Sequence, residues 1–152
     1  MTGGGIAGGL NHPIGLKSTA VLVDSNVLLD IMTENPEWSP WSARALAAAA
    51  DSGRIVINTI IYAEVSVRYT RIEDLEAALP RDIIEREAIP DPAAFLAAKA
   101  FLAYRRRGGS KTSPLPDFLI GAHAAVAGYR LLTRDTARYR TYFPTLPLIA
   151  PN

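Results

Sequence analysis

Short apolar runs alternate with longer helical patterns along the chain, and this alternation constrains the fold more than any other feature of the sequence. Strand-like runs are expected at residues 20–23, 54–58, 83–89, 130–133 and 146–149. Helices are expected at residues 41–52, 60–69, 72–79, 91–107 and 116–127, with a short one after Asp135. Such alternation predicts a mostly parallel sheet sandwiched between helices. The fold class is therefore α/β, in a single domain over residues 19–152.

The N-terminal segment differs in composition from the rest. Six of the eleven glycines fall within the first fifteen residues, so residues 1–18 are expected to form a flexible glycine-rich extension. The segment lacks the basic start and the continuous apolar stretch of a secretory signal. The longest uncharged stretch in the C-terminal half, residues 118–129, is too short to span a bilayer as a helix. A cytoplasmic protein without a membrane segment is expected.

The residue types present exclude several kinds of chemistry. Cysteine is absent, which rules out disulfides, thiolate metal sites and a cysteine nucleophile. The two histidines, His12 and His123, are too few for a multi-histidine metal site within one chain. A net charge of +1 does not by itself indicate a nucleic-acid-binding protein. Chemistry in this chain would depend on carboxylates, hydroxyls or metals bound by oxygen.

Four acidic residues stand where acids are usually unfavourable. Asp24 directly follows the first apolar run, and Asp135 comes two residues after the fourth, so both point to the carboxyl edge of the sheet. Each could instead simply cap the following helix. Glu64 shares or borders the apolar face of its predicted helix, where a carboxylate needs a partner, a proton or a metal. Asp117 repeats this pattern, with stabilisation by the helix dipole as the alternative.

Taken together, the four acids predict a metal site. Carboxylates that converge on one sheet edge repel one another strongly without a counterion. Ligands that are all oxygen favour Mg²⁺ or Mn²⁺ over zinc or copper. Such a site lowers the pKa of a bound water and neutralises the charge that develops on a phosphodiester during cleavage.

The same segments resemble a known family. The segments are Asp24-Ser25-Asn26 after a strand, Glu64, Asp117 in PDFLIGAHA, and LLTRDTARYRTYFP. Together they resemble PIN domains, and more narrowly the VapC-type ribonuclease toxins of toxin–antitoxin systems. The resemblance covers about residues 19–152 and implies a PIN-like nuclease domain. It implies that Asp24, Glu64, Asp117 and Asp135 are the catalytic, metal-binding acids. Asn26 and Thr133 would be polar helpers that hold a carboxylate or a metal-bound water.

The resemblance also implies partners. Members of this family cut RNA endonucleolytically with Mg²⁺ or Mn²⁺ at the acids, usually work as homodimers, and are silenced by a cognate antitoxin that wraps the catalytic groove. Two alternatives stay open: a catalytically inactive PIN-like module that binds RNA or protein, and a PIN nuclease with a housekeeping role in RNA processing. Retention of all four acids argues against the inactive module. An aspartyl phosphatase would need a second acid at the position of Asn26.

Basic residues surround the acids in the sequence. The three consecutive arginines 105–107 and Lys111 precede Asp117, and three more arginines flank Asp135: Arg134, Arg138 and Arg140. These cations could contact RNA phosphates, or they could form solvated helix ends. His123 is interpreted as a packed or hydrogen-bonded helix residue. Four aromatic residues are interpreted as packing residues rather than base-stacking platforms: Trp38, Trp41, Tyr139 and Tyr142.

Overall fold

The computed structural model describes residues 20–109 and 115–152, and it has a five-stranded sheet at its centre. The strands are β1 (Val21–Val23), β2 (Ile55–Ile57), β3 (Ile84–Arg86), β4 (Arg130–Leu132) and β5 (Leu148–Ile149). All neighbouring strands pair in parallel, in the order β3-β2-β1-β4-β5. The predicted α/β class and parallel sheet are confirmed. The predicted extension over residues 1–18 lies outside the described residues.

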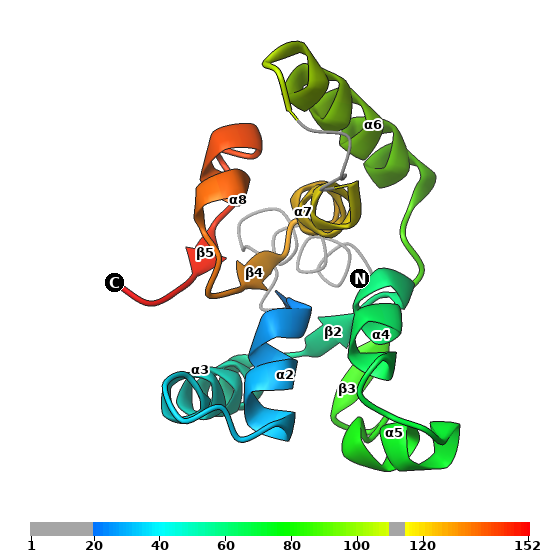
Figure 1. Cartoon of the computed structure of the whole chain (residues 1–152), viewed down its shortest axis with the longest axis vertical. Coiled ribbons are helices and arrows are strands. Elements are labelled where there is room, and N and C mark those ends of the chain that lie inside the picture. The colour runs from blue at the N-terminus through cyan, green and yellow to red at the C-terminus, as the bar shows by residue number, and fades with distance from the viewer. Residues whose placement is uncertain (1–19, 110–114) are drawn as a thin grey trace, which may run out of the picture.

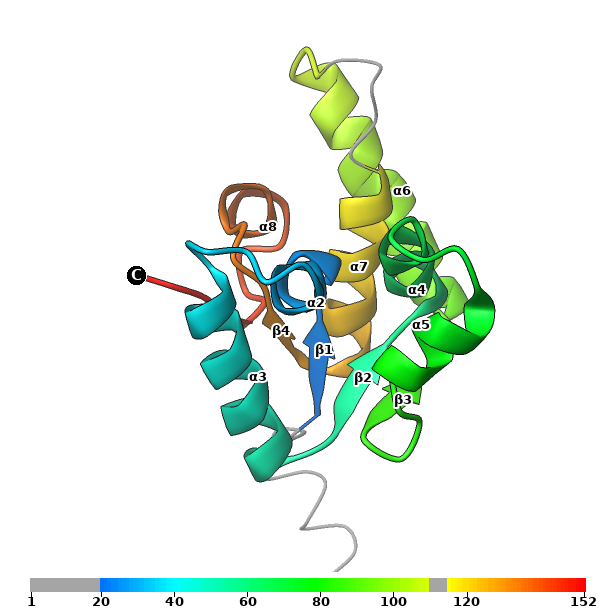
Figure 2. The same ribbon diagram turned by 60° about the horizontal axis from the view of Figure 1, so that its bottom comes forward.

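Helices cover both faces of the sheet (Figure 1). They are α2 (Ser25–Met32), α3 (Ser39–Ser52), α4 (Thr59–Ser66), α5 (Ile72–Ala78), α6 (Asp91–Arg106), α7 (Leu115–Ala127) and α8 (Ala137–Tyr142). Helices α2 to α5 lie on one side of the sheet and α6 to α8 on the other, as right-handed crossovers between parallel strands require. Figure 2 shows α6 packed outside α7 rather than on the sheet itself. No helix in the described ranges is long and apolar enough to cross a membrane.

The core consists of the central strands and the helix faces that cover them. Every residue of β1 and β2 is buried, which agrees with strands covered on both faces. Phe118 and Ile120 of α7 and Ile61 of α4 are fully buried in this core. The third strand is at the sheet edge and only half-buried beyond Ile84, as its alternating sequence predicts.

Several element boundaries differ from the sequence-based prediction. Thr59 and Asp91 are residue types that often cap helices, but each is the first residue of its helix. Asn58 caps α4, because its side chain accepts a hydrogen bond from the Ile61 N–H at 3.0 Å, and Pro90 precedes α6. Helix α3 begins at Ser39, two residues early, because Pro40 fits the first turn of a helix. The predicted strand at 83–89 pairs only over Ile84–Arg86.

The order of the strands determines where a site can lie. The chain runs from β1 outward through β2 to β3, and then returns to the other side of β1 as β4. This reversal places a topological switch point between β1 and β4, where ligands bind in open α/β sheets. Asp24 follows β1 and Thr133 follows β4, so both residues lie at this switch point.

Candidate active site

Asp24 occupies the centre of the switch point and is only 3% exposed. Its Oδ1 accepts a hydrogen bond from the Ser25 N–H at 2.8 Å, so Asp24 does cap α2. Its Oδ2 accepts hydrogen bonds from the hydroxyls of Thr133 at 2.8 Å and Tyr139 at 3.0 Å. The side chain is therefore held from two sides, and Asp24 caps α2 while it also contacts Thr133 and Tyr139.

Burial raises the pKa of Asp24 to about 6. The hydroxyls of Thr133 and Tyr139 lower this pKa, because they stabilise the carboxylate, whereas the charges of Asp117 and Glu64 raise it. Asp117 and Glu64 therefore lie near enough to Asp24 for their charges to act on it. Asp24, Glu64 and Asp117 come from three different elements, which the fold brings together.

Glu64 reaches the site from α4. Its Oε1 accepts a hydrogen bond from the Ser25 hydroxyl at 2.8 Å, which ties α4 to the first residue of α2. Burial raises the pKa of Glu64, the Ser25 hydroxyl lowers it, and the charge of Asp117 raises it. Ser25 therefore joins two of the predicted acids, through its backbone to Asp24 and through its side chain to Glu64.

Asp117 and Asp135 complete the acidic set. Arg138 of α8 donates to Asp117 Oδ2 at 2.6 Å. Burial raises the pKa of Asp117, Arg138 lowers it, and the charge of Asp135 raises it. Asp135 is exposed, and its backbone N–H donates to the Thr133 hydroxyl at 3.1 Å. Asp135 is not the cap of α8, because that position belongs to Thr136.

The donor set suits a hard divalent cation. The four side chains offer only carboxylate oxygens, which Mg²⁺ and Mn²⁺ prefer, and the raised pKa values of three of them reflect burial together with mutual repulsion. Across the two described ranges, no three acidic or histidine side chains already converge closely enough to hold an ion. Asp117 is instead turned onto Arg138, and Asp24 onto Thr133 and Tyr139.

The two polar helpers lie beside Asp24. The Asn26 Nδ2 donates to Asp24 Oδ2 at 3.4 Å and to the Thr133 hydroxyl at 3.3 Å. The Asn26 Oδ1 accepts from the backbone N–H of Arg134 at 3.2 Å. Asn26 therefore links the start of α2 to the segment after β4, and Thr133 links that segment to Asp24.

Tyr139 is a site residue that the sequence analysis missed. It was interpreted as a packing residue, and its ring is indeed buried, with 2% exposed. Its hydroxyl nevertheless reaches Asp24 Oδ2 from α8. No spacing in the sequence indicates this contact, because 115 positions separate the two residues.

Replacing Tyr139 with phenylalanine is expected to lower the free energy of unfolding by about 1.5–3 kcal/mol, because a buried charge-assisted hydrogen bond is lost while the ring remains. Urea unfolding at pH 8, where Asp24 is ionised, measures the difference. The matched control is Tyr142→Phe on the same helix, since Tyr142 is only half-buried. Equal effects of the two changes would contradict a specific role for the Tyr139 hydroxyl.

Arg134 is held by an aspartate that the sequence analysis did not single out. Its Nε and Nη2 donate to the two oxygens of Asp30 at 2.6 and 2.8 Å, and the Ser42 hydroxyl donates to the same carboxylate at 2.8 Å. The guanidinium also lies 5.2 Å from the centre of the Trp38 ring. Arg134 thus ties the segment after β4 to α2 and α3, and its predicted contact with RNA stays a prediction.

The arginines at the end of α6 face solvent. Arg105, Arg106 and Arg107 are exposed, and Arg105 and Arg107 lie over the rings of Phe101 and Tyr142 at 5.8 and 5.3 Å. Arg140 is also exposed. Lys111 lies outside the described residues. The exposed arginines are therefore free to meet a polyanion, which agrees with the predicted role without testing it.

His123 is a buried structural residue. It is fully buried in α7, where its Nδ1 is 3.0 Å from Asn58 Nδ2 and its Nε2 is 2.8 Å from Glu87 Oε1. Tyr129 donates to the other oxygen of Glu87 at 2.7 Å. The interpretation of His123 as a packed, hydrogen-bonded helix residue is confirmed, and through Asn58 it supports the start of α4.

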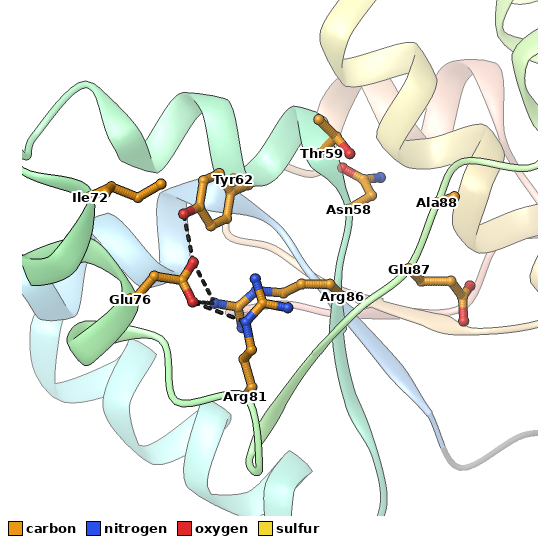
Figure 3. Close-up of a pocket in the computed structure, with 9 residues that line it drawn as sticks. All are labelled: Asn58, Thr59, Tyr62, Ile72, Glu76, Arg81, Arg86, Glu87 and Ala88. Atoms are coloured by element: carbon orange, nitrogen blue, oxygen red, sulfur yellow. Dashed lines mark hydrogen bonds and ion pairs between the residues drawn. The ribbon is translucent and has the colours of Figure 1, made fainter.

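A pocket of about 500 Å³ is lined by Tyr62 of α4 and Glu76 of α5 (Figure 3). Glu64 is two positions from Tyr62 on α4, and residues at that spacing point to nearly opposite sides of a helix, so Glu64 faces away from this pocket. Glu76 accepts hydrogen bonds from the Tyr62 hydroxyl at 2.6 Å and from Arg81 at 3.0 Å, with Arg86 at 3.4 Å. These donors lower the pKa of Glu76 to about 2. The charges of the acidic and basic side chains that line the pocket neutralise one another, so the pocket does not extend the acidic site.

Comparisons with known proteins agree with the fold described above. The family model of the PIN domain matches residues 21–144. A search of curated proteins finds no match. Among solved structures, VapBC2 from Rickettsia felis bound to a promoter DNA fragment has a TM-score of 0.67 at 17% identity, over 88% of this chain and 99% of the other.

Two further solved structures show the same likeness. VapBC-1 from nontypeable Haemophilus influenzae has a TM-score of 0.66 at 16% identity, over 86% of this chain and 97% of the other. A toxin–antitoxin complex from Klebsiella pneumoniae has a TM-score of 0.61 at 23% identity, over 87% of this chain and 98% of the other. At these identities the structures establish the shared fold.

Proposed function

The chain belongs to the PIN-domain family, and from this premise we propose that it is a Mg²⁺- or Mn²⁺-dependent endoribonuclease that acts as the toxin of a toxin–antitoxin pair. One observation carries the proposal. The charges of Asp117 and Glu64 raise the pKa of Asp24, the charge of Asp117 raises that of Glu64, and the charge of Asp135 raises that of Asp117. Acids gathered at one sheet edge, with Asp24 buried among them, need a compensating positive charge, and their oxygens suit a divalent cation.

The roles of the residues follow from their contacts. Asp24, Glu64, Asp117 and Asp135 would hold the cation, which when bound would supply an activated water and neutralise charge on the scissile phosphodiester. Thr133, Tyr139 and Asn26 keep Asp24 in one orientation. Ser25 keeps Glu64 beside it. The exposed arginines 105–107 would bind the RNA backbone, since phosphate contacts position a nucleic acid without reading its sequence.

The partners belong to the same proposal. The structural neighbours are described as VapBC assemblies and a toxin–antitoxin complex. These descriptions support a cognate antitoxin as a partner of this chain. The proposal also includes that the antitoxin covers the acidic edge, that the chain forms a homodimer, and that it acts in the cytoplasm. The outer face of α6 exposes Phe95 by 65% and Leu102 by 42%, which supports a further protein contact on that helix.

The proposal is tested with the purified chain, free of any antitoxin, and single-stranded RNA. Cleavage is expected with Mg²⁺ or Mn²⁺ and is expected to stop in EDTA. Glu64→Gln should abolish it, whereas Glu73→Gln, an exposed acid of α5, should not. Full activity in EDTA would contradict the metal requirement. RNA binding without cleavage under any metal would support the inactive PIN-like module, and cleavage that no antitoxin controls would favour a housekeeping nuclease.

Replacing arginines 105–107 with glutamine is expected to weaken RNA binding almost equally for all RNA sequences. Each phosphate contact on a single strand contributes ~0.7 to the slope of log affinity against log salt, so the slope should flatten by about 2. Fluorescence anisotropy over a range of salt concentrations measures it. Arg44→Gln, an exposed arginine of α3, is the control. An unchanged slope would mean that the three arginines only finish α6.

A further inference from the structure

Arg138 is the only partner that the structure shows, within the described residues, on the carboxylate of Asp117. Its Nη1 lies 2.6 Å from Asp117 Oδ2, a short charge-assisted hydrogen bond. The two side chains are 33% and 31% exposed, so the pair lies at the rim of the acidic site rather than in the core. Solvent, cations and RNA can therefore reach both groups.

A guanidinium and a divalent cation compete for such an oxygen. Both are attracted by the negative charge of Asp117, and the presence of one lowers the affinity for the other. Arg138 therefore supplies the positive charge that balances Asp117, an acid that is expected to bind metal.

The guanidinium of Arg138 lies on an aromatic surface while it is bound to Asp117. Its guanidinium carbon is 5.8 Å from the centre of the Tyr104 ring on α6. Tyr104 contacts Tyr142 edge-to-face at 6.1 Å, and Arg107 lies over Tyr142. When Arg138 leaves Asp117 it can stay on this aromatic surface, next to the arginines that end α6. A cation on an aromatic face keeps its charge available to a phosphate.

We propose that Arg138 is exchanged between Asp117 and the RNA: it neutralises Asp117 in the metal-free protein, and it binds a backbone phosphate once a divalent cation has taken Asp117. The exchange keeps the charge near the acids balanced before and after the cation arrives. It also makes the affinity for RNA depend on the cation, because a phosphate-binding arginine becomes free only when the cation is bound. This inference rests on the proposed function, which places a cation and RNA at this edge.

The first test measures binding of Mn²⁺ alone to the metal-stripped full chain by isothermal titration calorimetry. Arg138→Gln is expected to bind Mn²⁺ about tenfold more tightly, the lower end of the effect of an adjacent opposite charge. Arg138→Lys keeps the charge and should stay close to the wild type. Arg140→Gln, an exposed arginine two residues on, should change nothing. An affinity that is unchanged or weaker in Arg138→Gln would overturn the proposal.

The second test measures the salt dependence of binding to a single-stranded RNA oligonucleotide, with Ca²⁺ or with EDTA. Ca²⁺ takes oxygen ligands, and gel analysis verifies that the RNA stays intact. Arg138→Gln is expected to flatten the slope of log RNA affinity against log salt by ~0.7 with Ca²⁺ and to leave this slope unchanged in EDTA. Flattening to the same extent in both conditions would mean a permanent RNA contact, and no flattening in either would mean a purely structural ion pair. Either result would overturn the exchange.

Asp117→Asn provides an independent variant. Without its acidic partner Arg138 is free even in EDTA. The slope of log RNA affinity against log salt should therefore steepen by ~0.7 in this variant. It should not steepen when Asp117→Asn is combined with Arg138→Gln. A slope that does not steepen would overturn the exchange, even if Arg138→Gln fails to fold. None of these measurements uses cleavage. An inactive protein that shows the expected binding would therefore contradict the proposed activity and leave the exchange standing.

Discussion

Replacing Asp24 with asparagine is expected to reduce metal-dependent RNA cleavage more than about 100-fold and, in the absence of metal, to make the protein more stable at neutral pH. The loss of activity should exceed the 10- to 100-fold cost of losing a residue that only supports a metal ligand. The gain in stability follows from burial. Asp24 is 3% exposed beside two other acids, and its pKa is raised to about 6.

The pH dependence of this effect has a definite sign. A carboxyl group whose pKa is raised on folding binds its proton more tightly in the folded state, so ionised Asp24 destabilises the folded protein at pH values above about 6. The shift from 3.8 to about 6 corresponds to about 3 kcal/mol at neutral pH. The advantage of Asp24→Asn should therefore be greatest at pH 7–8, decrease as the pH falls through 6, and vanish below about 4.

Urea unfolding of metal-free protein at a series of pH values measures this difference. The asparagine keeps an oxygen that can cap α2, so the capping contact with Ser25 is conserved. Asp51→Asn, at an exposed position of α3, is the control. A variant that is less stable than the wild type at pH 8 and equally stable at pH 4 would show that Asp24 stabilises the fold as a carboxylate.

Much of the fold could be predicted from local sequence patterns. Short apolar runs such as residues 20–23 and 55–57 predict strands covered on both faces, and strands separated by helices predict a parallel sheet. The same argument brings Asp24 and Thr133 to one edge, because each directly follows a strand. Boundaries were less accurate, since the cap of α4 depends on how Asn58 is held by His123, a residue 65 positions away.

The contacts that support the acids could not be predicted. Asp30 and Tyr139 look like ordinary helix residues in the sequence, and only the packing of α2 and α8 against the end of β4 brings them to Arg134 and Asp24. The arginines near Asp135 illustrate the same limit. Arg134 pairs with Asp30, Arg138 pairs with Asp117, and Arg140 is exposed, although all three are close in sequence. Sequence proximity to an acid does not identify its partner.

The ion pair between Arg134 and Asp30 leads to a second large effect. Asp30 is 3% exposed and Arg134 is 28% exposed, and two hydrogen bonds of 2.6 and 2.8 Å join them. Removing one partner of a buried pair leaves a buried charge without compensation. Arg134→Gln should therefore cost about 3 kcal/mol, the lower end of the range for buried pairs because the arginine is partly exposed. For a chain of this length the expected decrease in Tm is about 6–12 °C.

Thermal unfolding distinguishes a structural arginine from an RNA-binding one. It is measured for Arg134→Gln, for Arg140→Gln as the exposed control, and for the double variant Asp30→Asn with Arg134→Gln. The double variant should recover part of the lost stability, because no charge is then left buried alone. The salt dependence of RNA binding by the folded Arg134→Gln protein should match the wild type, since the Arg134 guanidinium is bound to Asp30. A Tm within 1 °C of the wild type together with a slope flattened by ~0.7 would instead assign Arg134 to the RNA backbone.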